Sequence, residues 1–120
     1  MEESILRSVK QVLGLEVTDP AFDVDIVMHI NSVFSVLHQL GIGPVDGMFI
    51  GDATPTWADF LGDDPLLNAV KTYVCLRVRM LFDPPTTSFH IQAMEKQIEE
   101  LGWRMNVYRE GLLHPIVEVV

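Results

Sequence analysis

Apolar residues recur at spacings of three and four along several stretches of the chain, which is the period of an amphipathic helix. The clearest stretch covers residues 87–109, where either Thr87 or Ser88 can cap the first turn with its hydroxyl. Gly102 in its interior costs about 1 kcal/mol relative to Ala, which favours close packing at that point. The apolar side chains form one narrow seam, which we expect to be buried: Ile91, Met94, Ile98, Leu101, Met105 and Tyr108.

Two further helices are predicted in the first third of the chain. Residues 5–13 have a helical apolar period and end at Gly14, and acidic residues precede them at the positive end of the helix dipole. Residues 21–40 follow a turn, and either Asp19 or Asp23 can cap them. Both helices carry one apolar arc, so we expect them to pack against a common core.

The third main helix is expected to be the central and most buried one. Asp64 and Pro65 form a strong start signal, an N-cap followed by proline at the first helical position, and the apolar pattern continues to residue 82. Arg77 points away from the thin polar stripe of this helix, so it needs a carboxylate partner. That partner belongs either to a neighbouring subunit or to the next helix, whose acidic residues include Glu95, Glu99 and Glu100.

An irregular segment of residues 44–64 separates the second and third main helices. Residues 48–50 read as a short extended piece, and residues 56–61 as one or two helical turns capped by Thr56. A loop of this length is unusual in a small domain unless it has a function. Trp57 and Phe60 are therefore either a lid on the core or contacts for another chain. Our candidate partner-binding residues in this segment are Met48, Phe49, Trp57 and Phe60.

The last ten residues differ in character from the rest of the chain. They are apolar, rich in β-branched residues and interrupted by Pro115. Such a segment either packs back on its own core or adds as a strand to another protein, and we favour the second interpretation. The candidate partner-binding residues here are Leu112, Leu113, Ile116, Val117, Val119 and Val120.

These patterns predict an all-α fold, a compact bundle of about four helices with a long loop between the second and third main helices. Residues 1–110 form the helical domain, and residues 111–120 form an extended interaction tail. No apolar run approaches the roughly 18 residues that span a membrane, so we expect a soluble chain. The first four residues are acidic where a signal peptide is basic, so we expect no export.

The formal net charge of −9 is unevenly distributed. No Lys or Arg lies between Lys10 and Lys71, whereas nine Asp and Glu residues do. This distribution disfavours phosphate binding by the middle of the chain, because affinity for nucleic acids comes mainly from cations. The acidic segment is either an ordinary solvated surface or a surface that repels DNA or meets a basic protein.

Sequence motifs for catalysis are missing. The chain has no nucleotide-binding glycine pattern, no defensible Ser, His and Asp arrangement, and no paired CxxC or HExxH. Its single cysteine, Cys75, lies in an apolar helical run and is interpreted as a small packed hydrophobe. We therefore expect no enzyme activity, no cofactor and no metal, and instead a protein that binds proteins.

The sequence resembles the small head-to-tail connector (adaptor) proteins of tailed bacteriophages and prophages. The likeness covers roughly residues 4–109 and is carried by residues 22–34 (FDVDIVMHINSVF), by the run from 69–74 (AVKTYV) to 82–85 (FDPP), and by residues 95–104 (EKQIEELGWR). The FDPP joint between two long helices is the most specific of these elements.

The resemblance implies a ring of about twelve copies beneath the portal protein of a DNA-filled capsid. Such a ring lies in the neck of the virion after assembly in the bacterial host cytoplasm. It extends the DNA channel, binds no specific nucleic-acid sequence and docks the stopper or tail-completion protein. In such a ring, an acidic segment facing the lumen lets DNA slide without sticking, and the candidate residues are Asp46, Asp52 and Asp59.

A second interpretation also accounts for the acidity. Small helical inhibitors similar to immunity proteins present carboxylates to the basic site of a nuclease or another nucleic-acid-binding protein. That interpretation explains the charge but leaves the apolar C-terminal segment without a role.

Overall fold

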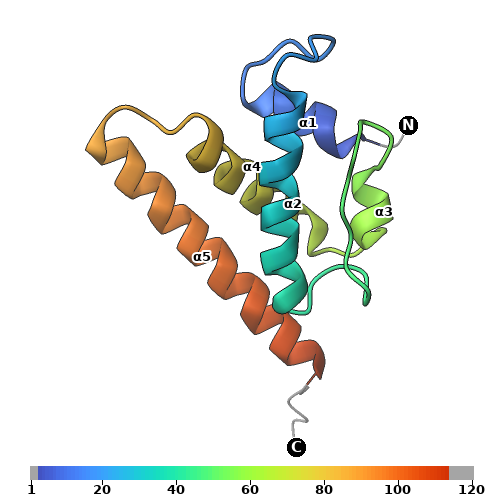
Figure 1. Cartoon of the computed structure of the whole chain (residues 1–120). Coiled ribbons are helices and arrows are strands. Elements are labelled where there is room, and N and C mark those ends of the chain that lie inside the picture. Colours follow the sequence, from blue (N-terminus) through green and yellow to red (C-terminus); the bar gives the residue numbers. More distant parts are fainter. Residues whose placement is uncertain (1–2, 114–120) are drawn as a thin grey trace, which may run out of the picture.

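The computed structural model describes the backbone of residues 3–113 and the side chains of residues 3–110. Five helices follow one another in this part of the chain (Figure 1): α1 (Ile5–Val12), α2 (Asp23–Gln39), α3 (Trp57–Leu61), α4 (Leu67–Phe82) and α5 (Ser88–Leu113). The described residues contain no strand, and their only β-type pairing is an isolated bridge between Ser4 and Thr56. The predicted all-α fold with a long loop before α4 is confirmed.

Helix α4 is the centre of the bundle, because it contacts each of the other four helices. The core lies mainly between α2 and α4, and α1 and α3 close it from two sides. Each fully buried aliphatic or aromatic side chain contributes about 1.5–3 kcal/mol through removal of apolar surface from water. The fully buried core side chains of α2 and α4 include Ile26, Ile30, Val33, Leu37, Val70, Val74 and Val78.

The predicted helix starts are correct to within a few residues, but two of the proposed caps are not. The Asp64 carboxylate accepts a hydrogen bond from the amide of Leu66 at 2.8 Å, which closes a turn, and α4 begins only at Leu67. Helix α2 has no side-chain cap at its N-cap position, Phe22. The carboxylate of Asp23 instead lies 2.8 Å from the ammonium of Lys10 on α1. An ion pair with another helix has thus replaced the expected local cap.

Helix α5 packs chiefly on α4 and forms one long edge of the molecule (Figure 1). Its cap is the predicted one, because the Thr87 hydroxyl accepts a hydrogen bond from the amide of His90 at 3.3 Å. The predicted seam does face the bundle, but among its members only Met105 is fully buried, and Tyr108 is 38% exposed. The expectation of a buried seam therefore holds only in part.

The C-terminal segment was predicted to be extended from residue 111 onward. The structure instead continues α5 to Leu113. The backbone from residue 114 onward lies outside the described residues. The side chains of the predicted tail, from residue 111 onward, lie outside the described residues.

Candidate functional site

In the described part of the chain, no group of three or more His, Cys, Asp or Glu residues is close enough to hold a metal ion. None of its helices combines the length and the apolar character that crossing a bilayer requires. The surfaces that can recognise another molecule are therefore the features to compare.

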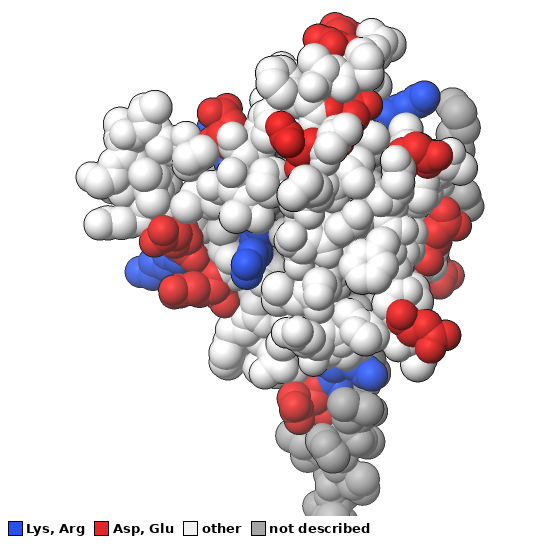
Figure 2. All heavy atoms as spheres, viewed as in Figure 1, with Lys and Arg blue, Asp and Glu red and all other residues white. Residues whose placement is uncertain are grey.

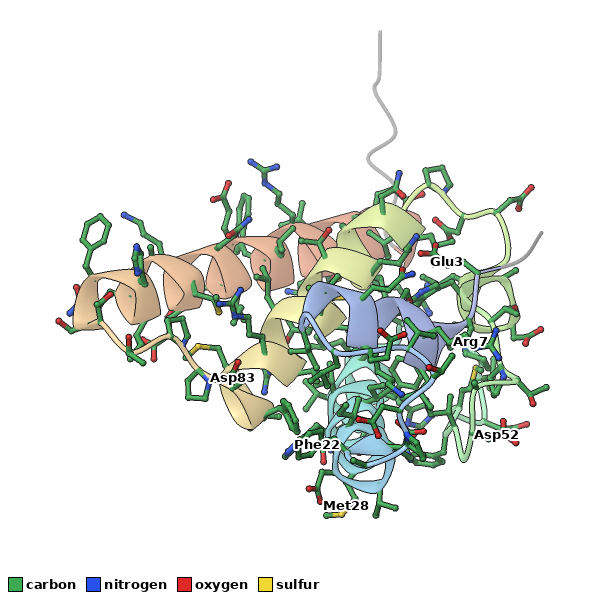
Figure 3. The ribbon with its side chains drawn as sticks, turned by 90° about the horizontal axis from the view of Figure 1, so that it is seen from above. Glu3, Arg7, Phe22, Met28, Asp52 and Asp83 are labelled. Atoms are coloured by element: carbon green, nitrogen blue, oxygen red, sulfur yellow. The ribbon has the colours of Figure 1, made fainter. Side chains whose placement is uncertain are left out.

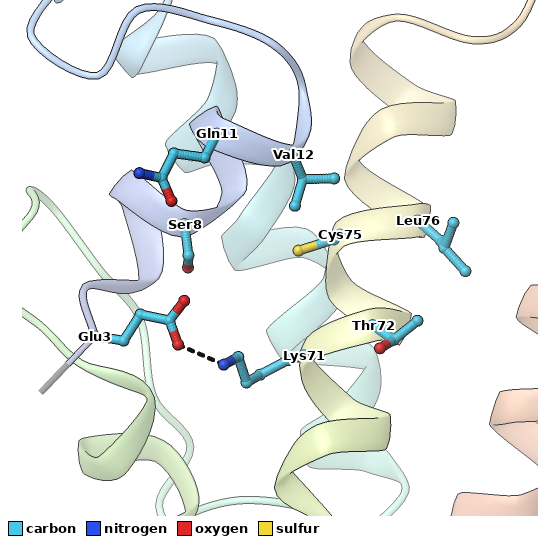
Figure 4. Close-up of a pocket in the computed structure, with 8 residues that line it drawn as sticks. All are labelled: Glu3, Ser8, Gln11, Val12, Lys71, Thr72, Cys75 and Leu76. Carbon is cyan, nitrogen blue, oxygen red and sulfur yellow. Dashed lines mark hydrogen bonds and ion pairs between the residues drawn. The ribbon is translucent and has the colours of Figure 1, made fainter.

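A groove of about 430 Å³ lies between α1 and α4 (Figure 4). Glu3 and Lys71 form an ion pair at one end of it, and Cys75 lies at the other. Burial is the main reason that the pKa of the Cys75 thiol rises to about 11, and the nearby Glu3 carboxylate raises it further, while Lys71 opposes the shift. A thiol with this pKa is almost entirely protonated at neutral pH, so it is a poor nucleophile. Cys75 is 9% exposed and belongs to the hydrophobic core, so it is the small packed hydrophobe that the sequence predicted.

The loop between α2 and α4 is fixed to the rest of the molecule by hydrogen bonds along its length. The side chain of Asn31 on α2 both donates to the carbonyl of Ile50, at 2.9 Å, and accepts from the amide of Ile50, at 2.8 Å. The Ser4 hydroxyl donates to the carbonyl of Ala53 at 2.7 Å. This segment is consequently an ordered platform, although it contains only one short helix.

Trp57 and Phe60 belong to the core, so their assignment as contacts for another chain is not supported. They are 2% and 4% exposed. The indole nitrogen of Trp57 donates to the Ser8 hydroxyl at 2.7 Å, and the ring of Phe60 lies 4.4 Å from that of Phe34, centroid to centroid. The alternative interpretation, a lid on the core, is the one that the structure supports. The reason is that the loop folds back across α1 and α2, which buries both aromatic rings.

The other two aromatic or apolar candidates of the loop lie nearer the surface. Phe49 is 66% exposed, and Met48 is half-buried against the core. Only Phe49 therefore offers a large apolar side chain to a partner.

Asp46, Asp52 and Asp59 are all exposed and lie on the loop or on α3. Asp52 accepts a hydrogen bond from the amide of Thr54 at 2.8 Å, and Asp59 completes a capping box with Thr56 at the start of α3. Figure 2 shows acidic atoms along the edge of the molecule that carries the loop and α3. The structure therefore brings the three carboxylates to one side, and it gives two of them a local structural role as well.

The guanidinium of Arg77 contacts a side chain of its own helix, α4. Its guanidinium donates to the Tyr73 hydroxyl at 2.9 Å and lies 5.5 Å from the centroid of the Tyr73 ring, within the range of a cation–π contact. Glu95 and Glu99 are exposed, and no ion pair joins either of them to Arg77 in the described part of the chain. The structure of one chain thus does not contain the intramolecular pair. A pair with a neighbouring subunit stays a prediction.

Sequence reasoning missed a second apolar line on α5 and the buried cation on α1. Phe89, Trp103 and Val107 are 75%, 66% and 48% exposed, although all three are large and apolar. Their spacings of 14 and 18 are close to whole numbers of helical turns, which was a signal available in the sequence. Lys10, in contrast, is only 2% exposed, and no sequence pattern indicates its burial.

Comparison with known proteins gives one match. A family model described as "Phage connector protein" matches residues 5–112, nearly the whole chain. No curated protein and no solved structure matches. On the extent of this match, the chain belongs to the phage connector family.

Proposed function

We propose that this connector forms a closed ring of about twelve copies beneath the portal protein, where it extends the DNA channel and docks the stopper or tail-completion protein. Its role is structural and non-catalytic, and its place is the neck of the virion. The observation that carries the proposal, beyond the family, is the acidic segment. Residues 11–70 contain nine Asp and Glu residues and no Lys or Arg, and three of these carboxylates lie exposed on one ordered side of the molecule.

A lumen lined by that side repels DNA instead of binding it. Proteins hold DNA mainly through Lys and Arg, which neutralise phosphates and release condensed counterions. An acidic wall offers no such contacts, so double-stranded DNA passes without being retained at any position. The hydrogen bonds between the loop and α1 and α2 support this role, because they keep the wall in place while DNA moves past it.

Charge reversal tests the orientation of the loop. Changing Asp46, Asp52 and Asp59 to Lys is expected to slow genome release, because a ring of about twelve copies then presents dozens of new cations to the passing phosphates. Asp46→Lys alone is the cleaner variant, since no hydrogen bond to its side chain is present in the described residues. Reversal of Asp83, Glu95 and Glu99, which are exposed and lie outside the loop, is the charge-matched control for the triple variant and is expected to leave release unchanged.

The measurement is the rate of DNA release from purified particles that contain the variant at the normal copy number. Slow release from the loop variants with normal release from the control supports a lumen-facing loop. Equal release rates from all variants would show that these carboxylates face elsewhere.

The C-terminal segment is proposed to dock on the portal or on the tail-side partner through Leu112, Leu113, Ile116, Val117, Val119 and Val120. Because the described part of α5 reaches Leu113, a chain that ends at this residue keeps every helical residue that the structure describes. Such a chain is expected to keep the thermal stability of the full-length protein and to lose incorporation into particles. Normal incorporation of the shortened chain would remove the segment from the docking surface.

A further inference from the structure

Helix α5 carries a line of exposed side chains opposite the seam that packs on α4. Phe89, Lys96, Trp103 and Val107 fall within a narrow arc, because at about 100° per residue their spacings return them to nearly the same direction. We call these four residues the α5 stripe. Its three apolar members are between 48% and 75% exposed, so a substantial apolar surface is unused by the single chain.

A second apolar surface lies at the N-terminal end of α2. Val24 and Met28 are 75% and 62% exposed and lie next to a groove of about 380 Å³. We call this surface the α2 groove, whose lining residues are Leu6, Val24, Val27, Met28, Gly51 and Ala53, with Asp23 and Asp52 at its edge. In Figure 2, acidic atoms lie near the N-terminal end of α2, and the rest of the face that carries α2 is largely free of charged atoms.

The two surfaces lie on opposite sides of the molecule. In Figure 3, α5 runs along one side, whereas Phe22 and Met28 project from the other, with α4 and α1 between them. The loop lies at one end of this view, where Asp52 is labelled, and it meets the groove through Gly51, Asp52 and Ala53. A contact between two different surfaces on opposite sides of a subunit is heterologous, and repeating it gives a ring when the rotation closes.

We propose that the α5 stripe of one copy packs into the α2 groove of the next copy, with Trp103 as the central anchor. This inference rests on the proposed ring and names the surfaces that build it. The loop reaches this contact only through Gly51, Asp52 and Ala53 at the groove, so Asp46 and Asp59 stay outside both surfaces and remain available to the lumen.

The exposed apolar area of the α5 stripe supports a second copy of this chain as its partner. Aromatic side chains bury about 150–250 Å² each, so the exposed parts of Phe89, Trp103 and Val107 offer on the order of 400 Å² of apolar surface. A standard interface buries about 800 Å² per partner, somewhat more than half of it apolar. The stripe thus supplies most of the apolar area that one side of such an interface needs.

The charged side chains at the α5 stripe and near the α2 groove support the same pairing. Lys96 lies within the stripe and is exposed, and it takes part in no ion pair in the described part of the chain. Exposed carboxylates lie near the groove, Asp25 on α2 and Asp52 on the loop, and neither is in an ion pair among the described residues. A symmetric contact of one stripe with another would bring two Lys96 side chains near each other and leave the groove uncovered. A contact between the α5 stripe of one copy and the α2 groove of the next copy avoids both problems.

Cysteine cross-linking in assembled particles tests the contact directly. The double variant Trp103→Cys with Met28→Cys places one thiol on each surface, while the native Cys75 is buried and its raised pKa keeps it unreactive. A short flexible bismaleimide is expected to convert the double variant into a ladder of covalent oligomers. Each single variant is expected to stay monomeric, because each interface then contains only one thiol. The control variant Trp103→Cys with Asp46→Cys, whose second thiol is on the loop, is also expected to give no ladder.

Each of the other cross-linking results would contradict one part of this proposal. A dimer from either single variant would indicate a symmetric contact, and a ladder from the control would move the partner surface to the loop. A monomer from the double variant, in particles that contain the chain at the normal copy number, would refute the stripe-to-groove contact and leave the ring intact. If particles made with the unsubstituted chain lack it altogether, the ring and this inference are refuted together.

Discussion

Lys10 allows a quantitative test of how α1 is joined to α2. Its ammonium lies 2.8 Å from a carboxylate oxygen of Asp23 and donates to the carbonyls of Val17, at 2.9 Å, and Asp19, at 2.7 Å. The side chain of Lys10 is 3% exposed, and that of Asp23 is 32% exposed. One buried cation thus connects the end of α1, the following turn and the first turn of α2.

Replacing Lys10 with Met keeps most of the side-chain volume and removes the charge. Removing one partner of a buried ion pair costs about 3–5 kcal/mol, because the remaining charge is left uncompensated. Asp23 is exposed enough to be rehydrated, so we expect a value near the lower limit, about 3 kcal/mol. For a chain of this length, that loss lowers Tm by roughly 10 °C. It is also a large part of the 5–15 kcal/mol by which a typical domain is stable.

Urea unfolding of the purified variants measures this loss. Far-UV circular dichroism follows the helices, and the fluorescence of the buried Trp57 follows the core. Arg7→Met, an exposed change on the same helix, is the matched control and is expected to alter the free energy of unfolding by less than about 0.5 kcal/mol. If Lys10→Met were as stable as Arg7→Met, the buried ammonium would have no role in joining the two helices. A double-mutant cycle that combines Lys10→Met with Asp23→Asn then measures the coupling free energy of the ion pair. We expect this coupling to be about 0.5–3 kcal/mol.

The remaining predictions concern two glycines and the thiol. A Cβ at Gly102 would lie 3.6 Å from the Tyr73 ring, an ordinary contact, so Gly102→Ala should raise the free energy of unfolding by up to about 1 kcal/mol in urea titrations. Gly43 has a φ of +97°, and a Cβ there would lie 2.8 Å from the Phe60 ring, so Gly43→Ala should be destabilising by more than 1–2 kcal/mol. If the free energy of unfolding were higher for Gly43→Ala than for Gly102→Ala, that result would contradict these contacts. Because its pKa is raised to about 11, Cys75 should react with a thiol reagent at pH 8 at least about a hundredfold more slowly in the native protein than in urea.

The sequence was sufficient for those features that depend on local pattern. The apolar period located the main helices, and the Thr56 cap that the sequence predicts is present at the start of α3. The hydroxyl of Thr87 likewise caps α5 as expected. These features depend on residues a few positions apart, so the chain itself brings them together.

Features that depend on distant residues were harder to predict. The burial of Lys10 requires the chain to reverse after α1 so that its ammonium meets residues of the turn and of α2. The burial of Trp57 requires a hydrogen bond to Ser8, 49 residues earlier. Sequence patterning contains no signal for such pairings, which explains why Lys10 was missed and Trp57 was left with two interpretations.

The periodicity of α5 identified which face meets the bundle, but not how much of that face is covered. Helical period assigns a direction to each side chain, whereas coverage depends on the length of the neighbouring helix. Helix α4 spans 16 residues and α5 spans 26, so part of α5 extends beyond its support. Arg77 is a similar case, because Tyr73 on its own helix is nearer than the acidic residues of α5 that the pattern suggested.

Among the candidate site residues, Asp46, Asp52 and Asp59 are exposed, and their place at the lumen stays a prediction. The count of charges along the chain located the carboxylates, and the loop then brought Asp46, Asp52 and Asp59 to one side. The apolar surfaces on α2 and α5 were not predicted. A side chain such as Met28 or Trp103 has the same character whether a partner helix covers it or not.

The number of copies of this chain in purified tailed particles tests the central claim most directly. Quantitative peptide mass spectrometry, referenced to the major capsid protein, measures that number in the assembled virion, where the portal is present. The account predicts a ring-sized copy number of about twelve per particle. Intact particles that contain none of the chain would contradict a structural role in the neck and would favour the acidic inhibitor, whose complexes contain one copy of each partner.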